Sequence, residues 1–94
     1  MITDIKRRAL HRAKILQGQL KGIQKMIEQE AYCMDIITQS LAVQKSLGSL
    51  NKLIVENHLT THSKDDMSSG DSNKQDRALA ELLTLYELTE VRGR

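Results

Sequence analysis

The chain of 94 residues carries a formal net charge of +2, and its only aromatic residues are Tyr32 and Tyr86. Its apolar residues are Leu, Ile, Val, Ala and Met, and it has no proline. This composition favours long helices and predicts a single all-α domain over residues 1–94. No apolar run is long enough to cross a bilayer or follows a basic N-terminal region, so we expect a cytoplasmic protein without a membrane segment.

The first predicted helix runs from Asp4 to about Glu28. Its apolar residues recur every three or four positions and form one stripe: Ile5, Ala9, Ala13, Leu16, Leu20, Ile23 and Ile27. Gly18 and Gly22 lower the helix propensity, which predicts that another helix or backbone comes close there. Residues 1–29 hold seven basic and two acidic side chains, a balance of +5, so the positive charge belongs to this helix.

A second helix is predicted from Cys33 or Met34 to about His62, after a short connection at 29–32. The apolar stripe of this helix includes Ile37, Leu41, Leu47, Leu50 and Ile54. The segment 63–73 is rich in Ser, Asp, Lys and Gly and is predicted to be a loop. A shorter third helix, ending near Glu90, is marked by Leu79, Leu82, Leu83 and Tyr86.

The second helix is too long for so small a chain to cover by itself. With a rise of about 1.5 Å per residue, it is roughly 40 Å long. We therefore expect a partner to bury its apolar face.

Three side chains that can bind a metal ion lie on this helix. His58 and His62 are four residues apart, so on a helix both can reach a single ion. Solvated polar residues near a helix end are an equally good interpretation of the pair alone. Cys33 cannot form a disulfide within the chain, and a lone cysteine is most often a small buried hydrophobe.

Taken together, the three residues favour a site shared between two chains. Cys33 and His58 are 25 residues apart, which on a continuous helix is about 37 Å and too far for one ion. In an antiparallel homodimer, Cys33 of one chain lies beside His58 and His62 of the partner subunit. The small residues at the expected crossing point are Ser46, Gly48 and Ser49. This arrangement predicts two metal sites per dimer, each built from both chains.

Several motifs of the chain are similar to those of one protein family. The motifs are Cys33, His58-Leu-Thr-Thr-His62, Gln17-Gly18-Gln19 and Ala42-Val43-Gln44-Lys45-Ser46-Leu47. In residue identity, spacing and helix order, the chain resembles the CsoR/RcnR family of metal-sensing repressors from about residue 6 to residue 88. The resemblance implies a three-helix protomer in which two long helices form an antiparallel hairpin. It also implies an antiparallel homodimer and a homotetramer built as a dimer of dimers.

The resemblance further implies a function. Such proteins bind operator DNA without metal and leave it when the ion binds, so that genes for efflux or resistance are switched on. They ligate the ion with a Cys at the start of the second helix and, from the other subunit, a His followed one turn later by a Cys or His. Cys33, His58 and His62 fall on those positions. Tyr32 resembles the tyrosine that supports the ligands in copper-sensing members, and an ordinary packing aromatic is the alternative.

The identity of the metal stays open at this point. A second thiolate would favour Cu(I), whereas His62 in its place moves the preference toward Ni(II), Co(II) or Zn(II). Nickel and cobalt sensors of the family also use the N-terminus and a His beside it, and Met1-Ile2-Thr3 contains no His. Cu(I) therefore stays possible. The third histidine, His11, is expected at a surface or DNA-facing position.

Other relatives sense small reactive molecules. Formaldehyde sensors pair the Cys with an N-terminal Pro, where this chain has Ile2, and persulfide sensors use a second Cys, which is absent. Sensing of formaldehyde or of thiol-reactive species through Cys33 is therefore the alternative function.

DNA is expected to bind to a basic surface, because the sequence has no helix-turn-helix pattern. Arg8, Arg12 and Lys14, with Lys45 from the second helix, are predicted to meet phosphates on one face, with a steep salt dependence. A solvated helix face is the alternative. In the family, Arg12 occupies a position associated with DNA binding, and Gln44 stands where Arg is frequent.

Two other classes of protein fit the sequence less well. Cys33 and His58 could act as a nucleophile and a base, but a flat helical bundle offers no evident substrate cleft, so we predict that the protein is not an enzyme. A purely structural helical adaptor would show neither metal binding nor salt-dependent DNA binding.

Overall fold

A computed structural model describes residues 1–92, with side chains described to Leu88, and is all-α as predicted. The elements in chain order are α1 (Thr3–Glu28), α2 (Cys33–His58), the π-helix η1 (Leu59–Ser63), α3 (Lys64–Ser68) and α4 (Ser72–Arg92). In the described part of the chain, no helix combines the length and the apolar character needed to span a membrane. The chain forms two compact units, Met1–Asn57 and the residues from His58 onward, and each is described separately.

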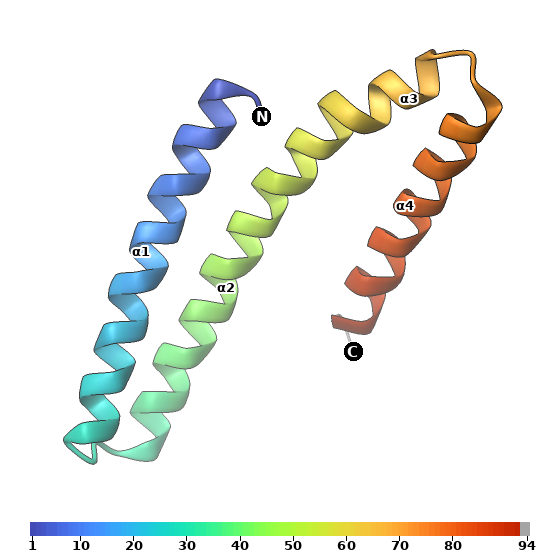
Figure 1. Cartoon of the computed structure of the whole chain (residues 1–94). Helices are drawn as coiled ribbons and strands as arrows, with labels where there is room; N and C mark the ends of the chain where they lie inside the picture. Colours follow the sequence, from blue (N-terminus) through green and yellow to red (C-terminus); the bar gives the residue numbers. More distant parts are fainter. Residues whose placement is uncertain (93–94) are drawn as a thin grey trace. The chain divides into compact units, whose positions relative to one another are not determined.

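In the first unit, α1 and α2 form an antiparallel hairpin (Figure 1). At its open end, the backbone N–H of Ile2 donates to Oδ1 of Asn57 at 2.9 Å, and Asn57 is buried. Beside this contact, Ile5 and Ala9 of α1 pack against Leu53 of α2. Removing these apolar side chains from water holds the helices together and fixes which residues of α1 face which residues of α2.

Most of the apolar stripe predicted for the second helix is open to solvent, although Leu50 packs, partly buried, against the core shared with α1. The side chain that α2 contributes to the core is Leu53, which lies outside that stripe. Four of the five stripe residues are exposed: Ile37 (49%), Leu41 (57%), Leu47 (45%) and Ile54 (39%). α2 therefore has two apolar surfaces, one packed on α1 and one left open in the single chain.

The C-terminal half of α1 is also more open than its pattern predicts. Leu20 and Ile27 are 55% and 59% exposed, although both belong to the predicted stripe. No atom lies within 4 Å of a Cβ placed on Gly18 or Gly22, apart from the helix's own backbone and chain neighbours. Among the described residues, the close approach predicted at these glycines is therefore not made.

The hairpin turns between α1 and α2 at a helix-ending motif. The N–H of Ala31 donates to the carbonyl of Met26 at 2.8 Å, and the N–H of Glu30 donates to the carbonyl of Ile27 at 3.0 Å. These two bonds define a Schellman motif, in which the residue after the helix adopts a left-handed conformation. Glu30 has φ of 53°, a conformation that glycine adopts without the steric cost borne by other residues.

The loop predicted at 63–73 is mostly helical, which corrects the sequence analysis. Helical backbone continues after α2 through η1 and α3 as far as Ser68, and the break before α4 comprises residues 69–71 only. Solvent-exposed helix positions readily hold Ser, Asp and Lys, so the composition of this segment resembled that of a loop. Gly70, with φ of 77°, supplies the turn.

Replacing Glu30 by glycine should stabilise the protein. Relief of the left-handed strain outweighs the greater freedom of glycine in the unfolded chain, so we expect a gain of up to about 1 kcal/mol. Denaturant unfolding at fixed protein concentration measures the change. Glu28→Gly, inside the last turn of α1, is the matched control and should destabilise by about 1 kcal/mol. A loss of stability in Glu30→Gly would contradict the account of this turn.

Candidate metal centre

His58 and His62 lie on neighbouring turns, as predicted. His58 is the last residue of α2, and His62 lies within η1. Their ring centroids are 5.4 Å apart, and the ring planes are inclined by 36°. A π-helix widens the turn between the two residues, and such segments are often found at functional sites. The two imidazoles are thus close enough to be ligands of one ion.

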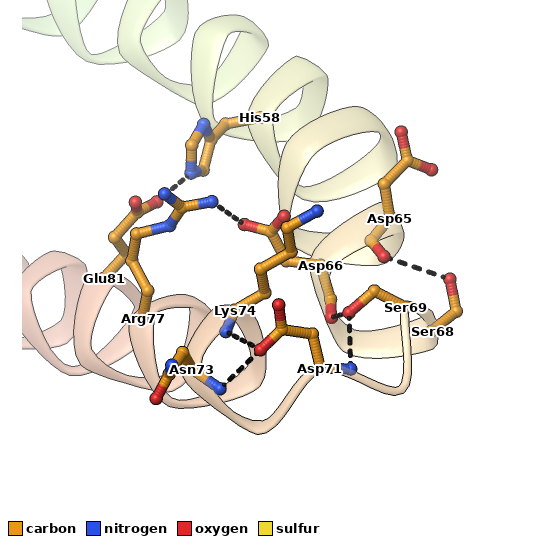
Figure 2. A network of polar contacts seen from close by, with 10 residues as sticks. All are labelled: His58, Asp65, Asp66, Ser68, Ser69, Asp71, Asn73, Lys74, Arg77 and Glu81. Atoms are coloured by element: carbon orange, nitrogen blue, oxygen red, sulfur yellow. Dashed lines mark hydrogen bonds and ion pairs between the residues drawn. The ribbon is translucent and has the colours of Figure 1, made fainter.

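One nitrogen of His58 has a carboxylate partner from α4. Nε2 of His58 lies against Oε2 of Glu81, as Figure 2 shows. A carboxylate can only accept, so Nε2 is the donor in this contact, and in a neutral ring Nδ1 keeps the lone pair that a metal ion needs. Metal-binding histidines commonly use one nitrogen for the ion and donate the other N–H to a carboxylate. Sequence reasoning missed Glu81, which is 23 residues from His58.

Polar contacts between α3 and α4 hold Glu81 in position (Figure 2). Arg77 lies on α4 one turn before Glu81, and its Nη2 is 3.1 Å from Oδ2 of Asp66 on α3. The side-chain amide of Gln75 donates to the carbonyl of Met67 at 3.2 Å. At the start of α4, Oδ1 of Asp71 accepts from the backbone N–H of Asn73 at 2.9 Å, which is an N-cap. The His58–Glu81 contact therefore rests on a locally organised turn.

Cys33 is the third predicted ligand, and the single chain does not bring it to the histidines. It is the exposed first residue of α2, whereas His58 is the last. Within the described residues there is no group of three or more Cys, His, Asp or Glu side chains that could hold an ion. Tyr32, beside Cys33, is 72% exposed, so it does not pack within the chain.

The residues predicted to contact DNA are exposed, but they do not all share one face. Arg8, His11 and Arg12 line a shallow groove along α1. Lys14 lies two residues beyond Arg12, about 200° further around an α-helix, so it points away from Arg12 within one chain, and its contact with DNA stays a prediction. Lys45 is exposed on α2.

The sequence matches one family of known proteins over most of its length. The model of the metal-sensitive transcriptional repressor family matches residues 5–87. The chain therefore belongs to the metal-sensitive transcriptional repressor family. Because this is a family of repressors, the prediction that the protein is not an enzyme is confirmed.

Individual relatives share this description. The copper-sensing transcriptional repressor CsoR of Mycobacterium ulcerans (strain Agy99) is 48% identical over 60 residues, which are 64% of this chain and 51% of the relative. The protein of the same name from Bacillus subtilis (strain 168) is 35% identical over 77 residues, or 82% and 73% of the two chains. The chain spans about half the length of the mycobacterial relatives it matches.

A solved structure has the same fold. The crystal structure of the copper-sensing repressor CsoR with Cu(I) from Geobacillus thermodenitrificans NG80-2 aligns with a TM-score of 0.74 at 26% identity. The alignment covers 93% of this chain and 90% of the other. The predicted three-helix fold is confirmed.

Glu81→Gln should weaken metal binding without unfolding the chain. The amide keeps the shape of the side chain but cannot replace the carboxylate charge that orients the His58 ring. We expect metal affinity to fall about 10- to 100-fold, measured by competition with a chelator. Glu87→Gln on the exposed side of α4 is the control and should leave affinity unchanged. Equal affinities in the two variants would contradict a supporting role for Glu81.

Proposed function

We propose that the protein is a metal-responsive transcriptional repressor whose metal site is shared between two subunits. The observation that carries this proposal is the pair of neighbouring imidazoles, His58 with its Nε2 held by Glu81, at the opposite end of α2 from an exposed Cys33. Without metal the protein binds operator DNA in the cytoplasm, and with metal it is released. Membership of the repressor family supports the DNA-binding part.

An antiparallel homodimer would complete the site. Ile37, Leu41 and Ile54 are exposed along α2, and a second copy of the same stripe would bury them by apolar contact. Running two copies of α2 in opposite directions puts Cys33 at the end where the partner's His58 and the partner's His62 lie. The exposed second half of α1 offers further apolar surface for a dimer of dimers.

The donor set fits a transition metal ion. One thiolate and two imidazoles make a three-coordinate set of donors that copper accepts, although by themselves they do not single it out. Ni(II) prefers square-planar or octahedral coordination and would need donors beyond these three. The copper-sensing relatives also favour Cu(I), so we propose Cu(I) as the inducer, with Ni(II), Co(II) and Zn(II) as competitors to be tested.

Bound metal would supply a cross-link between two subunits. The chain's own residues do the rest: Glu81 holds the His58 ring, and the α1–α2 hairpin presents Arg8 and Arg12 to the phosphates of DNA. Because α2 carries Cys33 and His58 and packs on the helix that carries Arg8 and Arg12, a change in how the subunits pair would alter both the metal site and the basic surface. A coupling free energy of about 1–3 kcal/mol is typical of such linkage.

Mixing two inactive variants tests whether the site is shared. Cys33→Ala and His58→Ala/His62→Ala should each lose tight metal binding. Refolded together in equal amounts, they should recover about a quarter of the wild-type metal content, because half of the dimers are mixed and each mixed dimer has one intact site of two. Metal bound per dimer is measured after gel filtration. No recovery in a mixture that forms mixed dimers would contradict the shared site.

Release from DNA tests the function itself. Operator DNA from upstream of the gene is titrated with apo protein and then with Cu(I), Ni(II), Co(II) or Zn(II). The inducing ion should lower the affinity of the protein for this DNA by a factor of about 5 to 150. His62→Ala should bind the DNA and ignore the ion, whereas Thr60→Ala is the control from the same turn. If all four ions leave the complex intact while formaldehyde releases it through Cys33, the metal proposal is wrong and the alternative function holds.

A further inference from the structure

A buried asparagine joins the last turn of α2 to the start of α1. Oδ1 of Asn57 accepts a hydrogen bond from the backbone N–H of Ile2 at 2.9 Å, and Asn57 is 6% exposed. The contact lies at the end of the hairpin where α1 begins and α2 ends (Figure 1). Neither the metal site nor the DNA surface predicted from the sequence includes Asn57, and the sequence alone did not connect it with Ile2, which is 55 residues away.

The first turn of α1 is tied to α2 through this bond. Ile2 is the N-cap residue of α1, and its apolar side chain makes no capping hydrogen bond. Backbone N–H groups at the start of a helix lack partners within that helix, so another element must supply them. The carbonyl of Ile2 accepts from the N–H of Lys6 at 2.9 Å. Ile2 therefore connects the side chain of Asn57 to the hydrogen bonds that begin α1.

The bond is continuous with the small apolar core of the hairpin. Leu53 lies one turn before Asn57 on α2, so the two side chains share one face of the helix. Leu53 packs on Ile5 and Ala9 of α1. Ala9 is the neighbour of Arg8 in the sequence. Because close-packed contacts transmit displacements, a movement of the last turn of α2 is passed to the turns of α1 that carry Arg8.

Asn57 is also joined directly to a candidate metal ligand. It precedes His58, and both residues belong to α2, so no loop between them can absorb a movement. The peptide bond that joins them is planar and stiff. When His58 takes its place as a ligand, the last turn of α2 must carry the imidazole there. The position of the ring and the position of Asn57 are therefore linked through a single peptide unit.

We propose that Asn57 is a positioning residue that couples the metal site to α1. Through its bond with Ile2, the last turn of α2 and the first turns of α1 move together when His58 binds or releases the ion. The inference rests on the proposed function and assigns a residue to the regulation of that site. The alternative is a purely structural contact, which would stabilise the hairpin equally with and without metal. Coupling instead contributes to the difference between the two states.

The test compares the affinity for operator DNA with and without Cu(I), or the other ion that releases the wild type. Asn57→Ala removes the acceptor, so the ratio of the two affinities should fall about 2- to 30-fold below that of the wild type. Saturation with metal is verified by competition with a chelator. Asn57→Asp keeps an oxygen acceptor and should retain the wild-type ratio. Asn51→Ala removes an exposed asparagine from the same helix and is the matched control.

Hydrogen exchange of the apo protein, followed by NMR, tests the contact itself. The amide of Ile2 should be protected in the wild type and in Asn57→Asp, relative to a short peptide of the same sequence, and unprotected in Asn57→Ala. If Asn57→Ala does not fold, Ile2→Pro removes the same bond from the donor side. The φ of Ile2 is −60°, which proline adopts without strain. A short extension before Met1, also present in the wild type used for comparison, keeps the proline nitrogen in an amide.

The outcomes separate this coupling from the proposed function. If metal releases the wild type from DNA and Asn57→Ala has the same ratio of affinities, the coupling role is overturned while the repressor stands. This holds even if both affinities have fallen, because an equal loss in the two states marks a structural contact. An unprotected Ile2 amide in the wild type also overturns the coupling role. A wild type that no ion releases from DNA refutes the proposed function and this inference with it.

Discussion

The packing of Ile5 and Ala9 on Leu53 is the contact on which the rest of the first unit depends. Few large apolar side chains are buried among the described residues, so this small cluster, with the buried Leu16 further along α1, sets the antiparallel register of α1 and α2. That register places Arg8 and Arg12 against Lys52, and Ile2 against Asn57. It also turns the second apolar stripe of α2 outward. A chain that buries so little apolar surface by itself is only marginally stable, and pairing with a second copy would bury more.

The second unit is organised by polar contacts rather than by apolar burial. Ala78 is its one buried hydrophobic residue among the side chains described, and the helices α3 and α4 are joined by Arg77–Asp66 and Gln75–Met67 contacts. These contacts place the carboxylate of Glu81 against Nε2 of His58. A carboxylate in this position fixes the orientation of the ring.

The two proposed activities share α2. Cys33 and His58, two of the three candidate metal ligands, are its first and last residues, and its last turns lie beside Arg8 and Arg12 of α1. In the proposed dimer, a change in how the ends of α2 are held would also move the basic side chains beside it. The proposed coupling between inducer and DNA therefore requires no long chain of intermediate residues.

The two long helices, their approximate limits and the separation of Cys33 from the His58–His62 pair were readable from the amino-acid sequence. The reason is that the 3.6-residue period and the rise of a helix are local properties of the chain. The segment 63–73 was misread as a loop, because composition alone does not distinguish a solvated helix from a turn. Membership of the CsoR-like repressors also followed from short motifs with fixed spacing.

Other features depended on the tertiary structure. Leu53 is the buried side chain by which α2 packs on α1, while most of the predicted stripe stays exposed; Glu81 reaches His58 across 23 residues; and Lys52 joins the arginines of α1. Each of these is a contact between two elements, and its partners are chosen by the register and rotation of packed helices. Periodicity along a single helix shows which residues share a face, but only the packing decides what that face meets.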